Sequence, residues 1–179
     1  MTSSFGLTVV LVGLVGAASA SAQPPTTPVA VPDRLKPPAN EELAVIVFAL
    51  GVQTYECRER KEQAGAWEWA FVGPEAELFD QRMTRIGRHY AGPHWEALDG
   101  SKVRGSVKAS AEATRAHSIP WLLLTAKSVG PDGAFSKVTS IQRVDTAGGV
   151  APGGGCSGAS TGMRVGVDYL AYYYFFAPR

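Results

Sequence analysis

The sequence predicts an all-β domain, either an antiparallel β-sandwich or a small closed β-barrel, behind a proline-rich N-terminal tether. Two observations support this fold class. Seven or more short segments have strand-forming composition and are separated by turn-forming residues. No long amphipathic helical pattern occurs among them. We expect one domain over residues 41–179, because the length and the 45% hydrophobic content suit a single core.

The expected elements follow from composition and turn signals along the chain. Strands should flank Gly51, and Asp99-Gly100 should form a tight hairpin turn because it tolerates positive φ angles. After this turn, apolar and polar residues alternate as in a half-buried strand. The remaining expectations are strands over 67–72, 121–129, 137–144 and 164–176, with a short edge segment over 77–79. Between them we expect a loop or one helical turn over 109–118, a turn at 131–133 and an irregular loop over 146–162.

The first 22 residues have the pattern of a secretory signal peptide. Residues 5–18 are apolar and uncharged but short for a membrane span, and residues 18–20 or 20–22 offer an A-x-A cleavage site. Because no Lys or Arg precedes the apolar run, an uncleaved anchor is the alternative. We therefore expect a secreted or periplasmic protein with no transmembrane domain after signal cleavage.

Residues 23–40 contain six of the twelve prolines. Proline lacks the N–H that a β-ladder needs and favours the extended polyproline II conformation. We expect this segment to be a linker with little packing.

Charge and composition exclude some partners. Seventeen Lys and Arg residues are interspersed with sixteen Asp and Glu residues, which leaves a formal net charge of +1. No basic block marks a nucleic-acid or anionic-membrane surface. The aromatic final segment resembles the closing strand of an outer-membrane barrel, but irregular alternation elsewhere disfavours that class.

The two cysteines, Cys57 and Cys156, both follow the predicted signal peptide. Export to an oxidising compartment makes a disulfide between them the simplest expectation. Closing so long a loop would stabilise the fold by about 4 to 5 kcal/mol if loop entropy dominates. The alternatives are two buried free thiols or one thiol at a metal site.

The segment 87–107 holds the best candidates for chemistry. His89 and His94 are weak candidates for zinc or copper ligands, because on an unbroken strand they would face opposite sides unless Gly92-Pro93 resets the alternation. Glu96 and Asp99 could be a carboxylate pair for acid–base catalysis, but a solvated Glu and a turn-forming Asp explain both residues without chemistry, and this is the favoured interpretation.

Other motifs are less informative. Residues 158–162 match G-x-S-x-G, but all three histidines precede Ser160, unlike in α/β-hydrolases, and the Gly/Ser-rich surroundings make a chance match the better interpretation. The nearby glycines lack a P-loop Lys-Ser/Thr, so no nucleotide cofactor is indicated. Exposed tryptophans on a rigid β scaffold could bind sugars or flat apolar ligands, and the chain has four: Trp67, Trp69, Trp95 and Trp121.

Several ordered motifs carry a resemblance to a known family. They are GVQTYEC (51–57), HYAGPHWEALDGS (89–101), IPWLLL (119–124) and IQRVDTAGGVAPGGGC (141–156). Together they resemble a secreted family of unknown function found in bacteria and fungi, over nearly all of residues 40–176. The resemblance implies an exported, single β-rich domain whose pattern includes both cysteines, and it implies no established activity.

The chain departs from that pattern at His94, where a small hydroxyl residue is usual, and at Thr54, where an aliphatic one is usual. The first departure counts against a two-histidine metal site. It leaves His89, Tyr90, Trp95 and Glu96 as the better candidates, with Asp99 beside them.

Two functional hypotheses result. The first is a noncatalytic exported β-domain that binds a small molecule, glycan or envelope component near segment 89–101 and the aromatic residues. The alternative is an extracytoplasmic hydrolase or metal-dependent enzyme that uses His89 and Glu96. The two hypotheses differ because an enzyme needs these side chains to converge in one pocket. The sequence indicates no particular cofactor.

Overall fold

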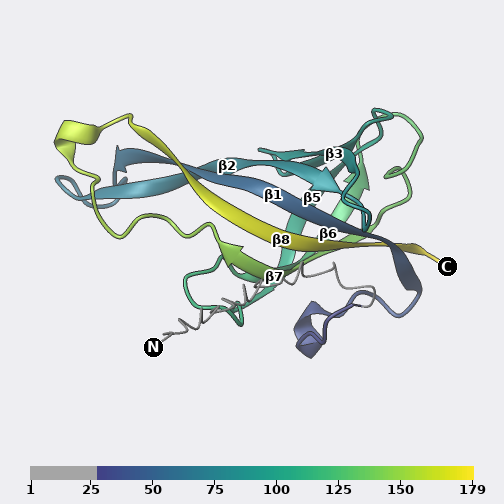
Figure 1. Ribbon diagram of the computed structural model, residues 1–179. Helices are drawn as coiled ribbons and strands as arrows, with labels where there is room; N and C mark the ends of the chain where they lie inside the picture. Colours follow the sequence, from purple (N-terminus) through teal and green to yellow (C-terminus); the bar gives the residue numbers. More distant parts are fainter. Residues whose placement is uncertain (1–27) are drawn as a thin grey trace, which may run out of the picture.

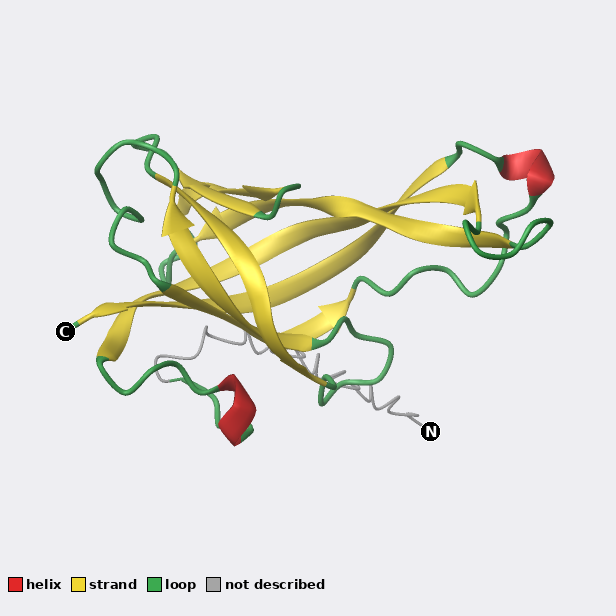
Figure 2. Cartoon of the chain, turned by 180° about the vertical axis from the view of Figure 1, so that it is seen from behind, coloured by secondary structure: helices red, strands yellow, loops and turns green. Residues whose placement is uncertain are grey.

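The computed structural model describes residues 28–179, so the predicted signal peptide and the first part of the linker lie outside the described residues. Eight strands account for most of this part of the chain, with two short 3-10 helices, as Figure 2 shows. The elements are η1 (Asp33–Leu35), β1 (Glu41–Glu59), β2 (Trp67–Phe79), β3 (Arg85–Tyr90), β4 (His94–Ala97), β5 (Lys102–Ala111), β6 (Trp121–Ser128), β7 (Ser140–Gly148), η2 (Gly158–Ser160) and β8 (Arg164–Pro178).

The eight strands form a closed barrel in which each strand pairs with the next along the chain (Figure 1). All pairs are antiparallel, and β8 returns to pair with β1. The fold is therefore the barrel of the two expected all-β architectures. Closure satisfies the backbone groups that an open sheet would leave at its edges.

Alternating side chains divide the strands into an inner and an outer face. The inner face carries the larger apolar core, which includes Leu78, Trp95, Ile141, Tyr173 and Phe175. A bulge between Val107 and Ala109 shifts the register of β5, so that the rest of this strand turns its small side chains outward.

The outer face is covered in part by the N-terminal segment. Leu35 is completely buried against Trp121 and Tyr174 on this face, and Gln142 Nε2 donates a hydrogen bond of 2.6 Å to the Leu35 carbonyl. The described end of the proline-rich segment therefore packs more closely than its composition indicates, because two apolar side chains besides Leu35, Val29 and Val31, also face the outer cluster.

Strand β1 runs without interruption through Gly51, where the sequence suggested two separate strands. A Cβ atom at Gly51 would overlap the Glu75 carbonyl and Ala76 of β2, so glycine is needed for the close approach of β1 and β2. The glycine is thus a packing requirement within one strand.

Three strands extend beyond the barrel as a projecting arm, seen on the left of Figure 1. The β2–β3 pairing covers residues 75–79 of β2, and β7 pairs with β8 only from Tyr169 onward. The remaining arm consists of residues 53–59 of β1, 67–73 of β2 and 164–168 of β8, with β1 in the centre.

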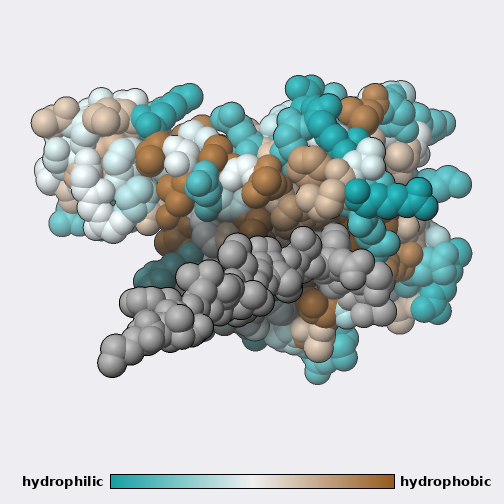
Figure 3. Space-filling view, viewed as in Figure 1, coloured by the Kyte–Doolittle hydropathy of each residue, from teal (hydrophilic) through white to brown (hydrophobic). Residues whose placement is uncertain are grey.

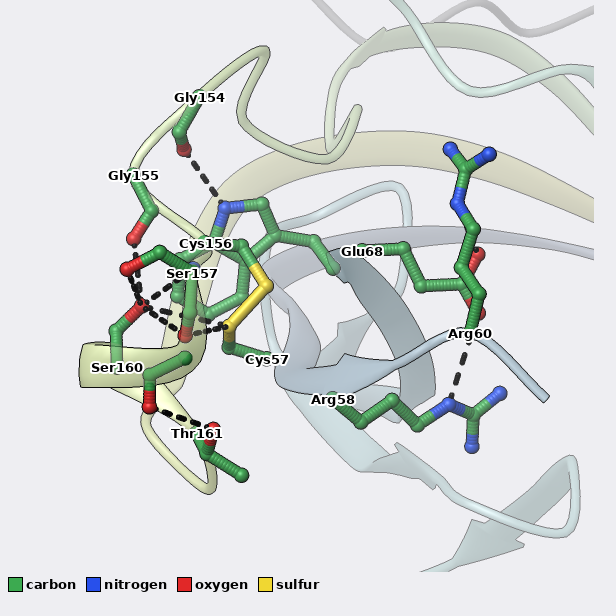
Figure 4. The surroundings of a disulfide bond; sticks show 12 residues. Cys57, Arg58, Arg60, Glu68, Gly154, Gly155, Cys156, Ser157, Ser160 and Thr161 are labelled. Carbon is green, nitrogen blue, oxygen red and sulfur yellow. Dashed lines mark hydrogen bonds and ion pairs between the residues drawn. A yellow bond between two sulfur atoms is a disulfide. The ribbon is translucent and has the colours of Figure 1, made fainter. Parts of the chain in front are cut away.

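The disulfide ties the loop between β7 and β8 to the arm. Cys57 lies on β1, and its bond to Cys156 closes a sequence separation of 99 residues, as expected from the sequence. Trp69 Nε1 donates a 2.8 Å hydrogen bond to the Gly154 carbonyl, and the Tyr55 hydroxyl donates one of 2.6 Å to the Gly149 carbonyl. Figure 4 shows the disulfide and the Gly154 carbonyl beside it. The long glycine-rich loop is therefore fastened to the arm by the disulfide and by several hydrogen bonds along its length.

Candidate functional site

A cavity of about 110 Å³ opens from the inside of the barrel where the barrel meets the arm. All eight strands contribute lining residues. Phe71 and Val107 form part of its apolar wall and are 55% and 60% exposed, so they lie at the mouth. The other apolar lining residues are Pro74, Pro93, Leu122 and Leu124.

Other hollows on the molecule are larger, but charged side chains on the outside of the sheet line them. One lies beside Glu75, Glu77 and Arg88, and another beside Arg58, Arg60 and Glu68. The barrel cavity differs from these because most of its lining is apolar and buried, which is the usual character of a small-molecule site.

Five polar side chains complete the lining of the cavity: Gln53, His89, Trp95, Arg143 and Tyr173. Four of them are buried and Arg143 is half-buried. Three buried polar atoms, Gln53 Nε2, Trp95 Nε1 and the Tyr173 hydroxyl, have no hydrogen-bond partner within the described part of the chain. Such atoms are uncommon in folded proteins and require an explanation at each position.

His89 is held as a neutral imidazole. Its ring stacks on Trp95 with centroids 4.1 Å apart, and its Nδ1 lies 2.8 Å from the His94 carbonyl. Because a carbonyl can only accept, Nδ1 carries the proton and Nε2 is left as an acceptor. Burial lowers the pKa of His89 to about 3, although the hydrogen bond to His94 acts in the opposite direction.

Arg143 supplies a positive charge to the cavity. Its Nε and Nη2 both donate to the Pro120 carbonyl, at 3.1 and 2.9 Å. Among residues 28–179, no carboxylate lies within 4 Å of this guanidinium. The side chain is therefore oriented by a neutral acceptor, and its charge has no direct counterion in the described chain.

Two tyrosines lie close together on the inner face of β8. Burial raises the pKa of Tyr173, and burial followed by the neighbouring Tyr173 raises that of Tyr169 well above its usual range. The two hydroxyls are close enough to influence each other, yet their geometry is not that of a hydrogen bond. Both side chains are consequently neutral hydroxyls at physiological pH.

The structure separates the predicted site residues onto the two faces of the sheet. His89 and Trp95 pair across β3 and β4 on the inner face. Tyr90 and Glu96 lie on the outer face, where the Tyr90 hydroxyl donates to Glu96 Oε2 at 2.6 Å and Arg88 donates to Oε1 at 3.0 Å. These contacts, chiefly that with Tyr90, lower the pKa of Glu96.

Asp99 is separate from both groups. Its Oδ1 accepts hydrogen bonds from the Ser101 backbone and hydroxyl, and its Oδ2 accepts one of 2.8 Å from the Ala134 backbone. The Ser101 hydroxyl contributes most to the lowered pKa of this carboxyl group. Asp99 joins the β4–β5 turn, where Gly100 has a φ of +85°, to the loop between β6 and β7.

The imidazoles of His89 and His94 do not converge. His94 pairs with Tyr90 and stacks on its ring at 5.3 Å, on the opposite side of the sheet from His89. The turn at 91–93 therefore does not bring the two side chains to one face. Within the described residues, no group of three or more His, Cys, Asp or Glu side chains is arranged to hold a metal ion.

Ser160, the centre of the G-x-S-x-G match, has its hydroxyl engaged in its own turn. It accepts from the Ser157 backbone at 2.8 Å and lies 3.0 Å from the Gly155 carbonyl (Figure 4). These contacts close the turn around η2 beside the disulfide. The Ser160 hydroxyl therefore has a structural role in this turn.

The tryptophans do not form an exposed platform. Trp95 is inside the barrel, Trp121 is buried on the outer face beneath the N-terminal segment, and Trp67 and Trp69 are half-buried on the arm. Apolar residues of the visible surface instead form a broken patch over β1 and β8 (Figure 3).

The comparisons with known proteins identify a family. A family profile described as "Protein of unknown function (DUF3455)" matches residues 37–177, which covers most of the chain. The chain belongs to the DUF3455 family. A comparison with curated proteins found no match. The matched span includes both cysteines and all eight strands except the last residue of β8, so the arm and the cavity lie within the family's domain.

Sequence reasoning missed three polar residues of the cavity: Gln53, Arg143 and Tyr173. Each is a polar residue at a position where alternation places apolar neighbours on the inner face. In IQRV at 141–144, a polar residue, Arg143, follows Ile141 on the same face of the strand, and this was a usable signal for a polar group inside the barrel. Only the paired strands show that the three side chains lie around one cavity.

Proposed function

We propose that this protein is an exported binding domain that holds a small, partly apolar molecule in the cavity of its barrel. The observation that carries the proposal is the enclosed cavity with an apolar mouth and buried polar atoms without partners. Eight-stranded barrels have an interior large enough either for side chains alone or for one small ligand. Here side chains fill much of the interior and leave a hollow of about 110 Å³.

Of the three ligand classes that the sequence suggested, a small molecule suits this geometry best. The glycan platform that the sequence suggested would need exposed tryptophans, and none of the four tryptophans is exposed. The enzyme alternative requires His89 and Glu96 in one pocket, and they lie on opposite faces of the sheet. A buried histidine with a pKa of about 3 is also a poor general base at neutral pH.

Export is part of the proposal and rests on the apolar N-terminal run and on the disulfide, since disulfides persist mainly in oxidising compartments. In the part of the chain that the structure describes, no helix has the length and apolar character needed to cross a membrane. The mass of the exported protein tests this proposal: it should show loss of residues 1–20 or 1–22, whereas an intact N-terminus would contradict signal cleavage.

The binding proposal is tested by blocking the mouth of the cavity. Six-carbon compounds such as hexanol and hexanoate should raise the melting midpoint of the full-length chain, because they bind the folded state. Val107→Trp places a large ring at the mouth and should abolish this shift. Arg104→Trp is the matched control, because it adds the same bulk on the outer face of the same strand and should leave the shift intact.

Two results would refute the binding site. One is the absence of a midpoint shift with every compound in the wild-type chain. The other is an equal shift in Val107→Trp, which would show that the compounds bind elsewhere.

A further inference from the structure

We propose that the cavity selects a small monocarboxylate: an apolar body of a few carbon atoms that ends in a carboxylate group. This inference rests on the proposed binding function and specifies the class of ligand. It follows from the kind of polar group that the cavity offers, from the charge of Arg143 and from the size of the apolar wall.

The unpartnered groups at the cavity are mainly donors. Gln53 Nε2 and Trp95 Nε1 can only donate, and the Tyr173 hydroxyl can donate as well as accept. All three side chains line the cavity and are at least nine-tenths buried. A ligand that satisfies them must present acceptor atoms, and a carboxylate offers two oxygens that only accept.

Arg143 makes the preferred acceptor an anion. The guanidinium has five N–H groups, and the two hydrogen bonds to the Pro120 carbonyl occupy two of them. The Tyr173 hydroxyl lies near enough to this guanidinium for the two groups to interact, although without the geometry of a hydrogen bond, so three N–H groups can face a ligand. Since His89 is neutral, Arg143 is the one cation among the residues that line the cavity. A half-buried cation without a counterion favours a bound anion and disfavours a bound amine.

The apolar wall limits the body of the ligand. Phe71, Leu122 and Leu124 would contact carbon atoms, and the volume is about 110 Å³. An apolar cavity of about 150 Å³ is large enough for benzene. The cavity therefore suits a short chain, with the remainder of a longer ligand leaving between Phe71 and Val107. A sugar is a poor occupant because its many hydroxyls would need acceptors as well as donors.

The experiment compares three ligands that share a six-carbon chain and differ only in the head group: hexanoate, hexanol and hexylamine. Each is titrated into the oxidised full-length chain at pH 7 by calorimetry. We expect hexanoate to bind at least tenfold more tightly than hexanol, and hexylamine to bind most weakly. Equal affinities for hexanoate and hexanol would overturn the carboxylate inference and leave the binding function standing.

Arg143→Gln should remove the preference between hexanoate and hexanol while hexanol still binds. Lys108→Gln is the matched control, because it removes one exposed positive charge from β5 outside the cavity lining. It should keep the preference. If Lys108→Gln abolishes the preference as well, the effect is a general attraction of charge and the proposal is wrong.

Tyr173→Phe is a second variant that tests the proposal even if Arg143→Gln does not fold. Because this change removes an unpartnered buried hydroxyl and little else, the unliganded protein should be as stable as the wild type or more stable. Its affinity for hexanoate should nevertheless fall severalfold. A variant that is stabilised and keeps full affinity would show that the hydroxyl does not contact the ligand, and would count against the proposed donor set. Failure of all three ligands to bind the wild-type chain would overturn both this inference and the binding function.

Discussion

The barrel and the arm are built from the same strands but are stabilised in different ways. In the barrel, each side of β1 and β8 continues into a closed ring, and the inner face packs aromatic side chains such as Trp95, Phe135 and Phe175 against one another. The arm has only three strands, its edges are unpaired, and Phe71 is half exposed.

The arm depends instead on a covalent link and on individual hydrogen bonds. Its ion pairs, Glu56 with Arg164 and Glu68 with Arg58 and Arg60, lie at the surface, where such pairs contribute little. The comparison shows that a sheet can be extended beyond its core when a disulfide fastens a loop to one face. The barrel cavity lies where these two regions meet, because Phe71 belongs to the arm and Tyr173 to the barrel.

The largest expected effect comes from a matched pair of phenylalanine substitutions, one in each region. Phe175→Ala should lower the free energy of unfolding by about 4 kcal/mol, because it leaves a cavity in a fully buried aromatic cluster. Phe71→Ala, on the half-exposed arm, should cost about 1 kcal/mol. Denaturant unfolding of both variants measures the difference. Equal losses would mean that the arm and the barrel share one continuous core.

The second effect, of similar size, is expected from removal of the disulfide, which should affect the arm more than the barrel. Replacing both Cys57 and Cys156 with Ser should cost about 4 kcal/mol, because the disulfide closes a long loop in the unfolded chain. Hydrogen exchange should then become rapid in the arm, whereas amides of the barrel strands should still require global unfolding. Uniformly faster exchange would show that the barrel also needs the disulfide. The wild-type chain in reducing buffer is an independent control, because it loses the disulfide without a substitution.

The smallest effect is the loss of folding stability in mild acid, which arises from the buried His89 in the barrel. The pKa of His89 is about 3 when folded, against 6.5 as the ordinary value, so the unfolded chain binds a proton first as the pH falls. Stability is therefore complete above about pH 6.5 and declines below it, with a loss of about 2 kcal/mol at pH 5. The carboxyl groups of Glu96 and Asp99, whose pKa values are lowered, lose their stabilising contribution only at lower pH, below their ordinary values of 4.5 and 3.8.

Denaturant unfolding at pH 7 and pH 5 tests this expectation. His89→Phe keeps an aromatic ring against Trp95 and should flatten the dependence on pH. His117→Asn is the matched control for removing a histidine, because His117 is exposed and has a φ of +54°, which Asn tolerates. An unchanged slope in His89→Phe would disprove the assigned role of the buried imidazole.

Much of the fold could be predicted from local patterns. The Asp99-Gly100 turn, the hairpin that joins β6 and β7, and the aromatic last strand follow from residue types and alternation, because turns and half-buried strands depend on near neighbours. The continuity of β1 through Gly51 was not predictable, since the reason for this glycine is the close approach of Glu75 and Ala76 from another strand.

The candidate site was predicted only in part. Segment 89–101 does contribute His89 and Trp95 to the cavity, but it also supplies Tyr90 and Glu96 to the opposite face, because neighbouring residues on a strand point to opposite sides. Gln53, Arg143 and Tyr173 come from distant parts of the chain and carry no local motif that connects them.

The sequence by itself determined the all-β class of the fold, the disulfide pair and the position of several strands and turns, because these depend on composition, alternation and short-range geometry. Only the tertiary structure decided which polar side chains share the inside of the barrel. Closure pairs β8 with β1 and brings strands separated by more than a hundred residues around one cavity, and the pairing register then sets which face of each strand is turned inward.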